Sequence, residues 1–122
     1  MKRTLEICGL ALLLAVLASA ADLTGTWKGA FEFNGNSVPL TFNLKHSGDT
    51  VTGTIEGLPT PNAKIEEGKV AGDALTFSVN IEYEGNPVKL VYKGKIAQDE
   101  IQFQFGTEDG AWGTEMTAKR ST

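Results

Sequence analysis

The sequence predicts an all-β protein, in which about eight antiparallel strands form an up-and-down meander that closes into a small barrel or flattens into a two-sheet sandwich. Apolar residues fall on every second position through most of the chain, and no helical period follows residue 20. Short turns rich in Gly, Asn and Asp separate these runs, so strands adjacent in sequence become neighbours in the sheet. A meander has two open edges unless its first and last strands pair, which favours closure.

A hairpin motif occurs more than once in the chain. Residues 68–79 recur as residues 94–105, displaced by 26 positions (94 − 68), and a looser copy spans residues 45–55. Each copy ends one strand, turns over an Asp and begins another strand. The side chains of these acids are expected to accept turn amides; they are Asp49, Asp73 and Asp99. Residues 31–42 also resemble residues 81–92, which favours two related halves of about four strands each, although a shared hairpin solution without common ancestry would look alike.

The first two strands are predicted from clear alternation. Residues 25–33 place Trp and Phe on one face and Thr, Lys and Glu on the other, and Asn34-Gly35 then suits a tight turn with positive φ. Residues 38–44 return the chain. Pro39 has no amide hydrogen, so it must lie at an edge, at a bulge or facing solvent.

The next two strands flank the longest break in the pattern. Residues 51–55 form a short strand, and the Pro-rich segment 57–62 cannot lie in a central strand. Residues 65–70 are the weakest strand, because Glu66 and Glu67 interrupt the alternation.

The second half of the chain predicts four further strands. Alternation is strong over a long strand that ends at Tyr83, and Glu84-Gly85-Asn86 turns the chain back. A polar loop, residues 106–110, precedes the last strand. The four strands are residues 75–83, 88–96, 101–105 and 112–118.

Residues 1–20 are predicted to be a signal peptide that is cleaved before Ala21, which leaves a single domain of residues 21–122 in the periplasm or outside the cell. Two basic residues precede an apolar run at residues 10–17 that is too short to span a bilayer comfortably. Ala18-Ser19-Ala20 has the small-x-small form of a cleavage site. An uncleaved N-terminal anchor is the alternative.

Charge and cysteine content exclude several functions. The whole chain has a formal net charge of −4 and the leader contributes +1, so the mature domain carries −5 and no basic patch for nucleic acid or anionic lipid. The single Cys lies in the leader, so the mature domain has no disulfide and no thiol chemistry.

The sequence gives little support for catalysis. His46 is the single histidine and lies beside the turn that contains Asp49, but no nucleophile is placed to complete a proton-transfer site. Glu82 and Glu84 share a strand face, which is expected to be solvated. The acidic residues show no metal-ligand spacing. We therefore expect no catalytic residue, no metal and no cofactor.

Inward-facing aromatic residues are the main candidates for binding. A barrel of eight strands is just wide enough to be filled by side chains or to hold one small ligand, and filling is the default for so small a domain. If a cavity is present instead, the candidate ligand-binding residues are Phe31, Phe42, Phe77, Tyr83, Tyr92 and Trp112.

Residues 22–27 contain a Gly25-x-Trp27 motif, and Lys119-Arg120 lies near the other end of the domain. These two ends resemble those of lipocalins and their calycin relatives, in which Gly-x-Trp opens the first strand and a basic residue lies over the Trp. The resemblance implies that Gly25, Trp27 and Arg120 close one end of the barrel through a cation–π contact. The chain is also similar to small lipocalin-like β-domains of secreted bacterial proteins, some of which are fused to α/β-hydrolases.

The chain also departs from that family. A full lipocalin is longer, has a helix after its barrel and usually carries a Thr-Asp-Tyr-like motif that is missing here, so a deep ligand cup is not implied. No hydrolase nucleophile is present either.

The sequence thus predicts a secreted, non-enzymatic binding module that holds a small apolar or amphipathic ligand, with the Pro-rich loop as a lid. The alternative is a filled barrel that acts through its surface as a protein-interaction or envelope-associated domain. A half-apolar, basic strand face favours this alternative; it consists of Lys89, Val91, Lys93 and Lys95. Neither reading involves nucleic acid or a transmembrane segment in the mature chain.

Overall fold

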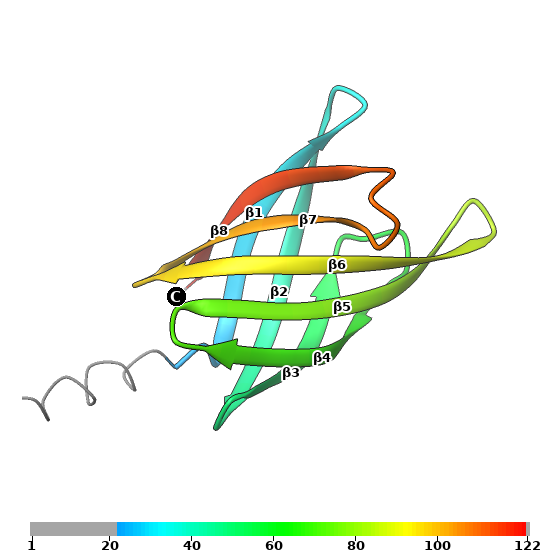
Figure 1. The fold of residues 1–122 in the computed structure, drawn as a ribbon. Coiled ribbons are helices and arrows are strands. Elements are labelled where there is room, and N and C mark those ends of the chain that lie inside the picture. Colours follow the sequence, from blue (N-terminus) through cyan, green and yellow to red (C-terminus); the bar gives the residue numbers. More distant parts are fainter. Residues whose placement is uncertain (1–21, 122) are drawn as a thin grey trace, which may run out of the picture.

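The computed structural model describes residues 22–121 as a closed antiparallel barrel of eight strands (Figure 1). Each strand pairs with its neighbours in sequence, and the first strand pairs with the last through residues 26–29 and 118–121. The predicted meander and its closure are confirmed, and the sandwich alternative is not observed. The predicted signal peptide lies outside the described residues. The strands are β1 (Gly25–Phe33), β2 (Asn36–Ser47), β3 (Thr50–Glu56), β4 (Ala63–Ala71), β5 (Ala74–Tyr83), β6 (Asn86–Ala97), β7 (Glu100–Thr107) and β8 (Gly113–Ser121).

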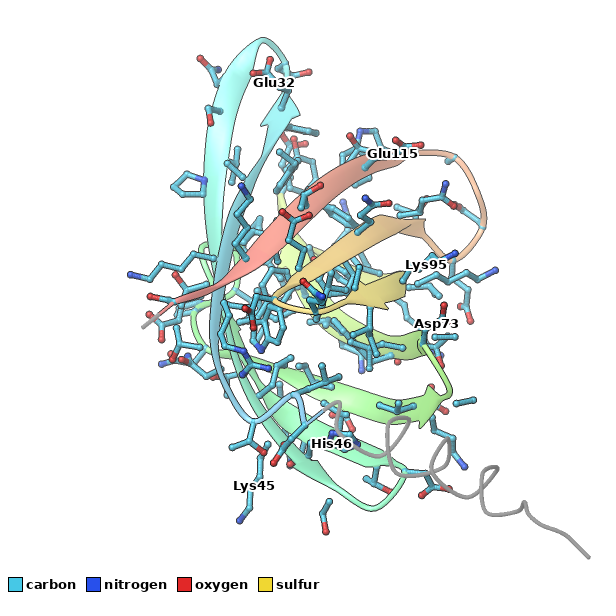
Figure 2. The ribbon with its side chains drawn as sticks, turned by 90° about the vertical axis from the view of Figure 1, so that its left-hand side faces the viewer. Glu32, Lys45, His46, Asp73, Lys95 and Glu115 are labelled. Carbon is cyan, nitrogen blue, oxygen red and sulfur yellow. The ribbon has the colours of Figure 1, made fainter. Side chains whose placement is uncertain are left out.

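The connections divide between the two ends of the barrel (Figure 1). At one end, which we call the closed end, lie the tight β2–β3, β4–β5 and β6–β7 turns together with residues 22–24. At the other end, the mouth, two tight hairpins alternate with two longer loops, residues 57–62 and 108–112. Figure 2 shows Glu32 near the mouth and His46 near the closed end.

Equivalent strands in the two halves of the barrel are separated by a constant interval in the sequence. Strand β6 lies 50 positions after β2 (86 − 36), and β7 and β8 follow β3 and β4 by the same interval (100 − 50 and 113 − 63). In the closed strand order, β1 and β2 are separated from β5 and β6 by two strands on either side, so equivalent hairpins lie on opposite walls. The similarity between residues 31–42 and 81–92 therefore lies within an arrangement of strands that recurs at an interval of 50 residues.

The turns at the closed end use their Asp residues differently from the prediction. The backbone carbonyls of Asp49, Asp73 and Asp99 accept amide hydrogens from the second strand that follows, at 2.9, 2.7 and 2.9 Å. Their side chains reach other partners: Thr50, Lys95 and Arg120 respectively. Each repeated Asp thus lies in a turn, and its backbone carbonyl links that hairpin to the next strand along the sheet.

Two irregular positions behave as the sequence suggested. Pro39 pairs with Ala30 of β1 but lies beyond the β2–β3 register, which starts at Thr41, so its missing amide hydrogen breaks no ladder. Strand β4 carries a bulge between Glu66 and Lys69, where the alternation fails. The last strand begins one residue later than predicted, because Trp112 belongs to the loop before it.

Within residues 22–121, no helix is long and apolar enough to cross a membrane.

Candidate functional site

The centre of the barrel is filled by aromatic side chains. Tyr92 lies between Phe77 and Phe105, with ring centroids 4.7 and 4.4 Å away and nearly parallel planes. Phe42 stacks on Phe103 at 5.0 Å and meets the edge of Tyr92. These rings leave no room for a ligand at mid-height, as the small size of the domain suggested.

The Tyr92 hydroxyl is buried in this cluster. It has no hydrogen-bond partner among residues 22–121. Burial raises the pKa of Tyr92 above its ordinary value, because the phenolate would have to form in an apolar environment. The hydroxyl therefore stays protonated and adds bulk to the core.

A cavity of about 500 Å³ opens at the mouth, beyond the filled centre. Its walls are almost wholly apolar, so water inside it makes few hydrogen bonds to protein. Both long loops and both tight hairpins contribute to it. The lining residues are Phe31, Phe33, Val38, Gly57, Leu58, Pro59, Ile81, Tyr83, Val88, Leu90, Phe105, Thr107 and Trp112.

Aromatic rings in edge-to-face contact line this mouth cavity and extend across it from β1 to β5. Phe31 packs against Phe105 at 5.1 Å, and Phe33 lies 5.7 Å from Trp112 and 6.2 Å from Tyr83. Tyr83 is 38% exposed, the one large hydrophobic residue on the surface of the described chain. The rings therefore run from the buried floor of the cavity to solvent.

The Pro-rich loop forms one side of this cavity. Leu58 is 9% exposed and packs on the core with Pro59 beside the cavity. Gly57 has φ +112°, and a Cβ there would lie 2.3 Å from the Pro39 carbonyl oxygen. Only glycine therefore allows the loop to pass this close to the backbone of β2. The Thr60 hydroxyl accepts the Glu82 amide at 2.8 Å and ties the loop to β5.

The second loop is held by its own hydrogen bonds. The Thr107 amide donates to the Trp112 carbonyl at 2.9 Å, and the Trp112 amide donates to the Thr107 hydroxyl at 3.1 Å. Asp109 accepts the Ala111 amide at 2.9 Å, and this bond lowers the pKa of the carboxyl. Trp112 is thereby fixed at the edge of the cavity.

The structure divides the six predicted ligand-binding residues into two groups. Phe31, Tyr83 and Trp112 line the mouth cavity, whereas Phe42, Phe77 and Tyr92 lie in the filled centre and do not. Leu58 and Phe33 were missed. For Phe33, the similarity between residues 31–42 and 81–92 carried the missing signal, because positions 50 apart line the cavity from opposite walls. Leu58 has no such equivalent, although the same interval also relates Gly57 to Thr107 outside the similar segments. The pairs that line the cavity are Phe31 and Ile81, Phe33 and Tyr83, Val38 and Val88, and Gly57 and Thr107.

The closed end is filled by Trp27 and the residues around it. Trp27 is fully buried and its indole Nε1 donates to the Leu23 carbonyl at 2.9 Å. Arg120 covers the ring at 4.4 Å and donates to the carbonyls of Thr24 and Asp22 at 3.1 and 2.8 Å. Gly25 lies beneath, where a Cβ would be 3.4 Å from the guanidinium. Access to the barrel interior is therefore from the mouth.

His46 has a structural position at this closed end (Figure 2). Its Nδ1 accepts the Leu23 amide at 3.1 Å and its Nε2 lies 2.9 Å from the Gly48 carbonyl, which fits a neutral ring protonated at Nε2. Asp22, rather than Asp49, is the nearby acid, 3.9 Å from Nδ1. The Thr24 amide bonds to Asp22 and lowers the pKa of that carboxyl. Across residues 22–121, no three His, Cys or acidic residues are grouped to hold a metal ion.

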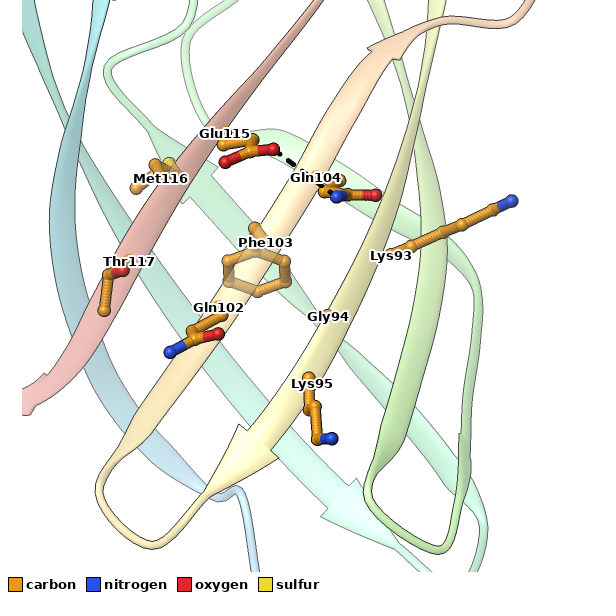
Figure 3. A pocket seen from close by; sticks show the side chains of 9 residues that line it. All are labelled: Lys93, Gly94, Lys95, Gln102, Phe103, Gln104, Glu115, Met116 and Thr117. Atoms are coloured by element: carbon orange, nitrogen blue, oxygen red, sulfur yellow. Dashed lines mark hydrogen bonds between the residues drawn. The ribbon is translucent and has the colours of Figure 1, made fainter.

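A second hollow, about 650 Å³, lies on the outer surface over β6, β7 and β8 (Figure 3). Charged and amide side chains surround it, including Lys93, Gln102 and Gln104, and Gln104 donates to Glu115 at 3.5 Å. Lys89, on the same strand face, lies 3.6 and 3.4 Å from Glu67 and Glu108. Both acids raise the pKa of Lys89, and its charge is balanced within the molecule.

No family model matches the sequence, and no curated protein matches it. Among solved structures, the chain is similar to a secretary abundant heat soluble (SAHS) protein from Ramazzottius varieornatus, at 14% identity and a TM-score of 0.43, over 81% of this chain and 95% of that one. A likeness at this level says nothing about a ligand. The closed up-and-down barrel of eight strands is itself the architecture of the lipocalins.

Proposed function

We propose that the protein is a non-enzymatic binding module that holds a small apolar or amphipathic molecule in the mouth cavity. The observation that carries the proposal is the cavity itself: about 500 Å³, almost wholly apolar and open at one end of a barrel that is filled elsewhere. This volume falls within the range of about 300–1,000 Å³ of small-molecule sites. Filling such a space with a hydrocarbon group removes apolar wall from water, which drives binding.

A neutral fluorophore tests the proposal. N-phenyl-1-naphthylamine emits strongly in apolar surroundings, and we expect a saturable rise in emission when it is titrated into the protein. Val88→Trp puts an indole into the cavity wall and is expected to weaken binding by about tenfold or more. Val91→Trp is the matched control, because Val91 lies on the same strand but faces the outer surface. If folded wild-type protein gives no saturable signal, or if Val88→Trp binds as well as Val91→Trp, the proposal is wrong.

Export is part of the same proposal. Residues 1–20 are proposed to be removed before Ala21, which delivers the domain to the periplasm or the exterior. Intact-mass measurement of the protein recovered from an expressing bacterial culture tests this. A mass that corresponds to residues 21–122 supports export, and the full-length mass counts against it.

Protein recognition is a second candidate function, supported by the outer hollow over β6 to β8. Its lysine and amide side chains suit a polar, partly acidic surface on a partner. Charge reversal by Lys93→Glu with Lys95→Glu tests this candidate. If the same envelope proteins are captured by wild type and variant, this face is not the interface.

A further inference from the structure

Carboxylates lie around the outside of the mouth, on the solvent-facing side of the strands and in the turns beside the lining residues. Glu32 lies between two lining residues of β1, Glu82 lies between two of β5, and Glu84 follows Tyr83 at the β5–β6 turn. Glu108 and Asp109 follow the lining residue Thr107 in the β7–β8 loop. All five acids are exposed. They stand on both of the opposed hairpins and on one loop, with Glu32 and Glu82 on the outer strand face and Glu108 paired with Lys89. The outer edge of the mouth thus has acidic groups on more than one side.

Positive charge at this rim is already paired. Lys89 is the one basic residue that adjoins a lining residue in sequence, between Val88 and Leu90. Its ammonium lies within 3.6 Å of Glu67 and 3.4 Å of Glu108. An anionic group that entered the mouth would therefore meet several carboxylates and no free ammonium from these adjoining positions.

The cavity wall adds to the effect of these charges. Few polar groups inside the cavity can screen or offset a charge at its entrance. A cleft with walls of low dielectric and rim charges of one sign concentrates its field on the entering molecule. The field therefore favours a cation at the entrance, while the interior favours hydrocarbon.

Aromatic rings lie at the same entrance. Tyr83 and Trp112 both contact Phe33, at 6.2 and 5.7 Å, and Tyr83 is partly exposed. Ring faces attract ammonium groups, and quaternary ammonium ions are bound by such aromatic surfaces. This observation is independent of the carboxylates and leads to the same class of ligand.

We infer that the mouth cavity selects cationic amphiphiles: the hydrocarbon part enters the cavity, and an ammonium or quaternary ammonium group remains at the entrance, beside the aromatic rings and within the field of the outer-edge carboxylates. The inference rests on the proposed function, since it names the class of ligand for the same cavity. It excludes fatty acids as preferred ligands, because their carboxylate would enter a mouth whose nearby unpaired charges are acidic.

Three probes with one hydrocarbon chain test the inference. Decyltrimethylammonium, decyl maltoside and decanoate, all below their micellar concentrations, are each used to displace N-phenyl-1-naphthylamine. We expect the cation to bind about tenfold more tightly than decanoate at low salt, with the neutral maltoside between them. The ratio is expected to fall towards one at about 0.5 M salt, where screening shortens the range of the rim charges.

A rim variant separates charge selection from cavity binding. Glu32→Gln combined with Glu82→Gln and Glu84→Gln should reduce the preference for the cation several-fold and leave displacement by decyl maltoside unchanged. Asp49→Asn with Asp73→Asn and Glu100→Gln removes the same charge at the closed end and should preserve the preference.

The outcomes distinguish the two proposals. If the fluorophore binds but the three probes compete equally, or decanoate competes best, the inference is overturned and the binding module stands. If the closed-end variant loses the preference as strongly as the rim variant, the selection comes from net charge and the inference is again overturned. If neither the fluorophore nor any probe binds to the folded protein, both proposals fail.

Discussion

The guanidinium carbon of Arg120 lies 4.4 Å from the centroid of the Trp27 ring, and this contact joins the last strand of the barrel to the first. The β1–β8 seam has four residue pairs, against ten for β5–β6. Arg120 strengthens this short seam, because its side chain also reaches two backbone carbonyls of residues 22–24 and the Asp99 carboxylate. The Trp27–Arg120 pair thus supports both the pairing of β1 with β8 and the filling of the closed end.

Trp27→Ala is expected to lower the free energy of unfolding by about 3–5 kcal/mol. Trp27 is fully buried. Its removal leaves a large cavity in a domain that has no disulfide to compensate. Urea unfolding, followed by far-UV circular dichroism, measures the change. An unfolding midpoint equal to that of the wild type would show that Trp27 does not support the closed end.

Arg120→Lys is expected to cost about 1–2 kcal/mol, although the charge is retained. An ammonium cannot make the forked contacts to the carbonyls of Asp22 and Thr24 while it covers the indole ring. The same urea titration gives the difference, and Lys119→Arg on the neighbouring outward position is the control. Equal stability of Arg120→Lys and wild type would rule out a geometric role for the guanidinium.

Tyr92→Phe is expected to shift alkaline unfolding to higher pH. Burial raises the pKa of Tyr92 in the folded state above the value of about 10 in the unfolded chain. The stability that depends on the protonated hydroxyl is therefore complete below about pH 10 and is lost above it, by about 1.4 kcal/mol per pH unit, as pH rises towards the folded-state pKa.

Phenylalanine removes this loss, and it also removes a buried hydroxyl that has no partner among residues 22–121. At about pH 7 we expect the variant to be at least as stable as the wild type. Thermal unfolding between neutral pH and about pH 11 measures both effects. Superimposable pH curves for the two proteins would contradict the assignment of the alkaline transition to Tyr92.

Gly53→Ala is expected to destabilise the domain by about 2–3 kcal/mol or more. Gly53 has φ +144°, and a Cβ there would lie 1.9 Å from the Asn43 carbonyl oxygen, so the β2–β3 ladder has to shift. Gly72→Ala is the control: its φ is +63° but nothing lies within 4 Å of the new atom, and about 1 kcal/mol is expected. A smaller loss at Gly53 than at Gly72 would refute the steric argument.

The strand pattern predicted the barrel well because alternation with period two decides which face of a strand is buried. It could not say how high along the barrel each inward residue lies. Phe31 and Phe42 are both inward, yet Phe31 reaches the mouth cavity and Phe42 lies in the filled centre. Height depends on strand tilt and stagger, which alternation does not encode.

The positions of loop residues were also not predictable from the sequence. Leu58 lies in an irregular segment, so no periodicity could predict that it folds back onto the core. Likewise, the Asp turns were recognised, but their carbonyl bonds to the following hairpin depend on how the hairpins lie side by side.

The 50-residue interval between equivalent strands bears on how the mouth cavity could have arisen. A single half of four strands would have two unpaired sheet edges and one wall of the cavity, and it could satisfy both edges by pairing with a second copy of itself. If the halves share an ancestor of half this length, that ancestor would have formed the barrel as a two-fold symmetric pair with two identical walls. The two walls differ in the present chain, where Phe33 on one side packs against Tyr83 on the other.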